Sequence, residues 1–139
     1  MKAVSVILDA NIYLDFWIRD KHQEKLDWAS RRYLIRQSAV VLHELRRGAK
    51  TKKTIVFIED LARHCPRIYA PLYDDWRIAS EILAKLRQKF HWNKEQLTSF
   101  QNDTLIACTC RRNGLTLITA NKKDFGLLQQ YVDFSAIFW

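Results

Sequence analysis

Four acidic residues are placed where carboxylates could do chemistry. Asp9 ends a short apolar segment, and Asp124 lies a few residues beyond another. Glu44 and Asp103 each interrupt a run of apolar residues with helical spacing. Isolated buried carboxylates are costly unless they are paired, protonated or bound to a metal. A ring of such carboxylates would suit Mg²⁺ or Mn²⁺, because these ions prefer oxygen ligands.

Two of these acids also have a simple structural explanation, because each stands near a predicted helix start. Asp9 can cap the helix that follows it, since Asp is a favoured N-cap. Asp124 fits a capping box, three residues after Asn121. A cap explains either acid alone as well as a catalytic role does.

The two helical acids have alternatives of the same kind. Glu44 can lie on the solvent edge of its helix and pair with Arg47 or Lys50. Asp103 can cap a new helix if the chain breaks near Phe100. Four such coincidences are less probable than one, so the test is whether the four carboxylates lie near one another.

The elements that would position these acids alternate along the chain. Apolar runs predict strands at 4–8, 33–35, 67–69, 115–119 and 132–138. Periodicity predicts helices at 11–18, 22–32, 39–48, 53–64, 74–89, 94–112 and 121–131. Ser38 and Gly48 are expected to begin and close the third helix. The alternation indicates one α/β domain over residues 1–139, with a mostly parallel sheet flanked by helices. Ligands of such sheets bind beyond the carboxyl ends of the strands.

The composition indicates a polyanionic partner. The net charge is +8 and the pI is about 9.6, which favours nucleic acid, an anionic membrane or an acidic protein. A basic protein that is merely soluble would have the same composition. No apolar run is long enough to span a bilayer and no signal peptide is evident, so we expect a cytoplasmic protein.

Two other classes of site are disfavoured. The three cysteines have neither framework nor zinc-site spacing, so we expect buried, reduced thiols at Cys65, Cys108 and Cys110. The lack of a Gly-rich phosphate loop argues against a nucleotide-dependent kinase or dehydrogenase.

Four segments together resemble the acidic motifs of PIN-domain ribonucleases, most closely the VapC toxins of bacterial toxin–antitoxin pairs. They are residues 7–12 (ILDANI), 38–48 (SAVVLHELRRG), 102–107 (NDTLIA) and 119–125 (TANKKDF). The resemblance spans nearly the whole chain. It implies a three-layer PIN-like domain with a four- or five-stranded parallel sheet, and a Mg²⁺- or Mn²⁺-dependent endoribonuclease. It also implies a homodimer and a cognate antitoxin protein as partner.

The resemblance assigns roles by position. Asp9, Glu44 and Asp103 match the three main metal-binding acids. The fourth ligand can be Asp124, Asn121 through its carbonyl or a water, or neither. A separate set of polar residues matches positions that commonly support the site: Asn11, Ser38, Thr119 and Asn121.

Basic residues surround these motifs and can hold RNA phosphates around the metal centre. The candidates are Arg46, Arg47, Lys50, Lys122 and Lys123. Each cluster can equally be a solvated helix face, and the same patch could receive an acidic antitoxin segment.

Tryptophans offer a second kind of contact. Trp28 and Trp76 fit the core faces of helices, whereas Phe16 and Trp17 could form part of a dimer or antitoxin groove.

Two other functions remain open. The first is a non-catalytic PIN-like domain that binds RNA or a protein partner, with its acids serving as caps. The second is an α/β phosphoryl-transfer enzyme with Asp9 as nucleophile. Asn11 weakens that reading, because one such class has a second acid two residues after the first.

Overall fold

The computed structural model describes residues 3–139, which form a wholly parallel five-stranded sheet in the order β3-β2-β1-β4-β5. The strands are β1 (Ser5–Leu8), β2 (Leu34–Ser38), β3 (Ile68–Tyr69), β4 (Thr116–Thr119) and β5 (Ser135–Phe138). The parallel α/β sheet expected from the sequence is therefore confirmed, with five strands.

Strand β1 occupies the centre of the sheet because its side chains are apolar on both faces. Val6, Ile7 and Leu8 are at most 2% exposed. Burying a side chain of this size contributes roughly 1.5–3 kcal/mol. Since all strands are parallel, β1, β2 and β4 end at the same edge of the sheet, where Asp9, Ser38 and Thr119 lie.

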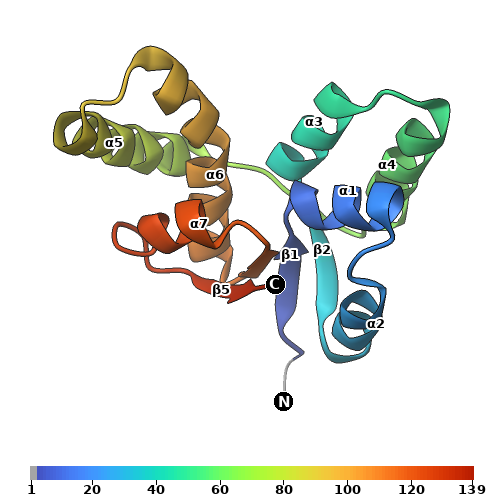
Figure 1. The fold of residues 1–139 in the computed structure, drawn as a ribbon. Helices are drawn as coiled ribbons and strands as arrows, with labels where there is room; N and C mark the ends of the chain where they lie inside the picture. The colour runs from blue at the N-terminus through green and yellow to red at the C-terminus, as the bar shows by residue number, and fades with distance from the viewer. Residues whose placement is uncertain (1–2) are drawn as a thin grey trace.

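Seven helices flank the sheet on its two sides, so the helices and the sheet together form three layers. They are α1 (Ala10–Arg19), α2 (Gln23–Arg32), α3 (Ala39–Gly48), α4 (Lys52–His64), α5 (Tyr73–Phe90), α6 (Lys94–Asn113) and α7 (Lys122–Leu128). Figure 1 shows α1 to α4 on one side of the central strands and α5 to α7 on the other. Glu44 on α3 and Asp103 on α6 therefore come from opposite sides of the central strands, and these two helices contact each other.

The helix boundaries follow local capping chemistry. The Ser38 hydroxyl accepts hydrogen bonds from the backbone N–H groups of Val40 and Val41, which begins α3 as expected. Helix α6 ends at Gly114, whose φ of 61° is a left-handed conformation that glycine adopts without strain. Helix α3 ends at Gly48 as expected, but the φ of Gly48 is not positive, so no left-handed turn closes this helix.

Two expectations were wrong in detail. Helix α7 ends at Leu128 rather than at 131, because its carbonyl accepts from Tyr131 and Val132 and closes a turn. Trp28 and Trp76 are 41% and 47% exposed, so neither is a core residue.

Helix α6 is fixed to its neighbours by an ion pair whose carboxylate is buried and whose arginine is partly exposed. Asp75 of α5 is 1% exposed, and Arg112 Nε donates to its Oδ2 at 2.8 Å. The same oxygen accepts from the Leu72 backbone N–H, and Arg112 Nη2 donates to the Ala70 carbonyl. Breaking a buried pair typically costs about 3–5 kcal/mol, so this contact helps to fix the helix that carries Asp103.

The remaining sequence expectations concern cysteines and membranes. Cys108 and Cys110 are buried, Cys65 is only partly so, and all three are free thiols. Within residues 3–139 no helix has the length and apolarity needed to cross a membrane.

Candidate functional site

Asp9 is held rigidly at the end of β1. It is 4% exposed and caps α1, since its Oδ1 accepts a hydrogen bond from the Ala10 N–H at 2.8 Å. Its Oδ2 accepts from the Thr119 hydroxyl at 2.7 Å and from Asn11 Nδ2 at 3.1 Å. Asp9 is therefore both a cap and a fixed carboxylate, and the two explanations do not exclude each other.

Burial dominates the electrostatics of Asp9. Desolvation raises the pKa of its carboxyl, and the hydrogen bonds from Thr119, Ala10 and Asn11 oppose this shift. Thr119 and Asn11, expected as supporting residues, thus stabilise the ionised form of Asp9. Thr119 also accepts from the Asn121 backbone N–H, which links Asp9 to the start of α7.

Glu44 lies on α3 and points one oxygen into the protein. Within residues 3–139 its Oε1 is buried and has no hydrogen-bond partner. Burial, and then the charge of Asp9, raise the pKa of Glu44 to about 7, while Arg47 opposes the shift. No ion pair to Arg47 or Lys50 forms in the described chain, so the alternative pairing of Glu44 is not found, although its side chain is partly exposed.

Asp103 lies in the middle of an unbroken α6. A fresh helix start near Phe100 is therefore excluded as its explanation. Burial raises the pKa of Asp103 to about 8, with further contributions from the charges of Asp9, Glu44 and Asp124. All four acids consequently share one electrostatic environment, although they come from four separate elements.

Asp124 is held by a cap at the start of α7. The Asn121 side-chain oxygen accepts from the Asp124 backbone N–H at 3.2 Å, and Asn121 Nδ2 donates to Asp124 Oδ2 at 3.0 Å. Asn121 therefore uses its carbonyl oxygen for the cap. Of the two candidates for a fourth ligand, Asp124 is the one that brings charge to the site.

The donor set suits a hard divalent cation. All four acids supply oxygen, and a buried carboxylate oxygen without a partner is what a cation would satisfy. Within the described chain, however, no three His, Cys, Asp or Glu side chains are close enough to enclose a metal. Like charges repel, so the carboxylates would have to turn toward a bound ion.

The predicted basic residues differ in availability. Arg46 is engaged by Glu59, with Nε and Nη2 donating at 2.9 and 3.3 Å. The other four are exposed and make no ion pair within residues 3–139: Arg47, Lys50, Lys122 and Lys123. Of these residues, Arg47 interacts with the acidic site, because its charge lowers the pKa of Glu44.

The sequence analysis missed Lys94 and a row of polar residues on the same helix. Lys94, Thr98 and Asn102 line a groove with Glu44 and Arg47. Their spacing of four places them on one face of α6. That periodicity was visible in the sequence, but only the contact between α3 and α6 in the structure shows that these side chains share a groove with Glu44 and Arg47.

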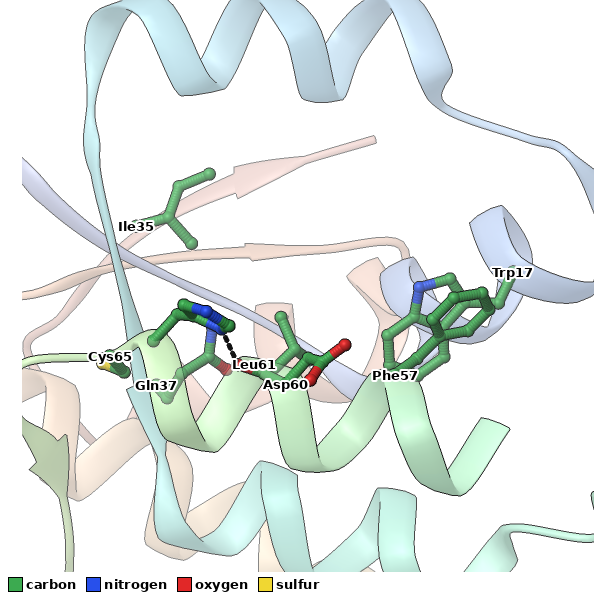
Figure 2. Close-up of a pocket in the computed structure, with 8 residues that line it drawn as sticks. Trp17, Ile35, Gln37, Phe57, Asp60, Leu61 and Cys65 are labelled. Atoms are coloured by element: carbon green, nitrogen blue, oxygen red, sulfur yellow. Dashed lines mark hydrogen bonds between the residues drawn. The ribbon is translucent and has the colours of Figure 1, made fainter. Parts of the chain in front are cut away.

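A second recess lies away from the four acids. Figure 2 shows this pocket of about 370 Å³, where Trp17 and Phe57 lie against each other, with ring centroids 5.4 Å apart. Its other lining residues come from β2, α4 and the residue after α4: Ile35, Gln37, Asp60, Leu61, His64 and Cys65. An adjoining recess shares Trp17 and includes Phe16, so the residues expected in a partner groove do line open recesses.

Comparison with protein families gives one clear match. A family model for the PIN domain matches residues 6–128. Because this match covers most of the chain, the protein belongs to the PIN-domain family. No curated protein matches the sequence.

The fold is also similar to those of several solved structures. The structure of VapBC-1 from nontypeable Haemophilus influenzae matches with a TM-score of 0.72 and 20% identity, over 98% of each chain. VapBC2 from Rickettsia felis, bound to a DNA fragment from their promoter, gives 0.70 and 23% over 98% of this chain and 99% of that one. VapBC-5 from Mycobacterium tuberculosis, of the VapBC family of toxin–antitoxin systems, gives 0.65 and 19% over 98% and 99%. These likenesses confirm the three-layer PIN-like fold.

Proposed function

We propose that this protein is a divalent-metal-dependent endoribonuclease and the toxin of a toxin–antitoxin pair. The observation that supports it best is Glu44, whose buried oxygen has no partner in residues 3–139 and whose neighbours are further carboxylates. Such an arrangement is costly for stability, and a bound cation gives it a purpose. The PIN family and the VapBC-like fold support the same conclusion.

The metal, Mg²⁺ or Mn²⁺, would be held by Asp9, Glu44 and Asp103, with Asp124 as fourth ligand. When bound, it would lower the pKa of a water and neutralise the charge that develops on the phosphodiester. Thr119 and Asn11 keep Asp9 oriented for this role through their hydrogen bonds. Exposed cations beside the acids would bind the flanking RNA phosphates.

The antitoxin would dock on the recess of Figure 2 and the one beside it. Trp17 packs against both Tyr13 and Phe57 in tilted geometry, with each ring centroid 5.4 Å away, so it presents an aromatic surface that is already held in place. An apolar side chain of the partner would fill the recess.

A homodimer is the expected assembly. Leu72, Tyr73 and Trp76 at the start of α5 are 56%, 78% and 47% exposed. Clustered exposed apolar side chains of this kind commonly mark a protein interface.

Expression in a bacterial host would test this proposal. Induction of the wild-type chain should arrest growth and deplete a defined RNA, because the carboxylate site is intact. Glu44→Gln should abolish both effects, whereas Glu24→Gln, a matched change at an exposed position on α2, should not. Equal toxicity of the wild-type and Glu44→Gln proteins would refute the enzymatic role and favour a domain that only binds RNA or protein.

A further inference from the structure

A groove opens beside Glu44, one of the four acids, between α3 and the first half of α6. We call it the α3–α6 groove. It has a volume of about 630 Å³ and is lined by Glu44, Arg47, Lys94, Glu95, Thr98, Ser99 and Asn102. This size falls within the range of roughly 300–1,000 Å³ typical of small-molecule sites.

One end of the groove reaches the carboxylate site through Glu44 on α3 and Asn102 on α6. Glu44 and Arg47 lie three residues apart and therefore share a face of α3. On α6, Asn102 directly precedes Asp103 in the sequence, and Lys94 lies about 12 Å further along the axis at roughly 1.5 Å per residue. A chain whose phosphate sits at the acids would thus extend along this groove.

Two cations in the groove are free to bind an anion. In the chain from residue 3 to 139, neither Arg47 nor Lys94 has a carboxylate within 4.0 Å. Arg46, in contrast, is engaged by Glu59. The cations beside the acids therefore differ in availability, and Arg47 and Lys94 are both unpaired and in the groove.

The hydroxyl groups of the groove are oriented as acceptors. The Thr98 hydroxyl donates to the Lys94 carbonyl at 2.8 Å, and the Ser99 hydroxyl donates to the Gln96 carbonyl at 3.0 Å. Since each hydroxyl proton is used, the remaining lone pairs can accept from a ligand. The 2′-OH of a ribose is such a donor and distinguishes RNA from DNA.

We propose that the α3–α6 groove is the subsite for the RNA nucleotide next to the cleaved phosphate. Arg47 and Lys94 bind the adjoining phosphate, and Thr98 and Ser99 accept from its ribose. This assignment rests on the proposed ribonuclease function and extends it, because it names where the strand runs. Besides Glu44, which belongs to the carboxylate site, Glu95 is the other acid of the groove, and its charge repels a phosphate.

The test is a binding titration in the Asp9→Asn background, which prevents cleavage. The probes are a short fluorescein-labelled single-stranded RNA and a DNA of the same sequence, with Mg²⁺ at several salt concentrations. Arg47→Gln and Lys94→Gln should each weaken RNA binding about 3–10-fold and reduce the salt slope by about 0.7. Lys21→Gln, an exposed lysine outside the groove, is the control and should change neither quantity.

Two further variants give results that a general loss of charge or fold would not. Glu95→Gln should tighten binding of the RNA about twofold or more, because it removes a like charge. The double variant Thr98→Val with Ser99→Ala should lower the preference for RNA over DNA while leaving the salt slope unchanged.

The possible outcomes test the groove assignment and the nuclease proposal separately. If Arg47→Gln and Lys94→Gln bind RNA with the parent's affinity and salt slope, the groove assignment is overturned, whether or not the wild type cleaves RNA. If they lose binding but the wild type cleaves nothing, the groove stands as an RNA-binding site and the nuclease proposal fails. Poly-glutamate, titrated in the same way, serves as the probe for an acidic protein segment. If Arg47→Gln and Lys94→Gln lose binding of poly-glutamate while their RNA binding is unchanged, the groove is a protein site and the assignment is overturned.

Discussion

Asp103→Asn should stabilise the metal-free protein, and the gain should grow as the pH rises. Burial, and then the charges of Asp9, Glu44 and Asp124, raise the pKa of Asp103 from its ordinary 3.8 to about 8. Between these values the folded protein keeps a proton that the unfolded chain releases. The folded state is therefore favoured at low pH, and this contribution is lost as the pH rises toward 8. Asn does not ionise in either state and escapes the loss.

The size of the effect follows from the pKa difference. A gap of about four pH units at about 1.4 kcal/mol per unit sets an upper limit of about 5 kcal/mol at pH 8. Asp103 is not fully buried, and water that reaches it reduces this value. We expect a gain of about 2 kcal/mol at pH 8 and almost none at pH 4, which corresponds to a rise in Tm of roughly 5 °C or more.

Urea unfolding in EDTA at pH 4, 6 and 8 would measure this gain. Asp133→Asn, the same change at an exposed position, is the control and should shift stability by less than about 0.5 kcal/mol at every pH. Mg²⁺ should reverse the order, since it stabilises the wild type and not the variant. If Asp103→Asn is no more stable than the wild type at pH 8, Asp103 does not lie among buried like charges, and the electrostatic argument for the site fails.

Three other changes test separate parts of the structure. Thr119→Val removes the hydroxyl that donates to Asp9, so activity or metal affinity should fall about 10–100-fold, whereas Thr119→Ser should retain both. Equal activity in the wild type and both variants would contradict the role of this hydrogen bond. Arg112→Met leaves Asp75 buried without its charged partner, so the free energy of unfolding in urea should fall by about 3–5 kcal/mol. A fall of less than about 1 kcal/mol would show that this ion pair does not hold α6 in place. Trp17→Ala should weaken binding of a cognate antitoxin at least about tenfold in calorimetry, whereas Trp76→Ala should not. If Trp76→Ala weakens antitoxin binding and Trp17→Ala does not, the antitoxin binds elsewhere.

The sheet could be predicted because its signals are local. An apolar strand with a polar end, such as 4–8 followed by Asp9, carries its own evidence of burial and direction. The position of Asp9 was also within reach, because parallel strands end at one edge and bring Asp9 close to Thr119. The order of the four motifs indicated the PIN family, which no single acid could indicate.

What the sequence did not show depends on contacts between distant segments. The pairing of Asp75 with Arg112 spans 37 positions, and either residue alone reads as a surface charge. Gly48 fits a closing position by type, yet Ala49 follows it in extended conformation and no left-handed turn is needed. Trp76 fits an apolar stripe, but the far side of that stripe has no partner within the described chain. In each case a local rule was outweighed by a packing arrangement that only the fold defines.

The proposed nuclease needs a metal ion held by the carboxylates in order to cleave RNA. The most direct measurement is incubation of total cellular RNA with purified, partner-free protein in Mg²⁺ or Mn²⁺, in EDTA, and with the Asp9→Asn variant. Our account predicts discrete products that require both the metal and Asp9. Intact RNA in both metals, with protein shown to be folded, would contradict it, as would products that persist in EDTA or with Asp9→Asn.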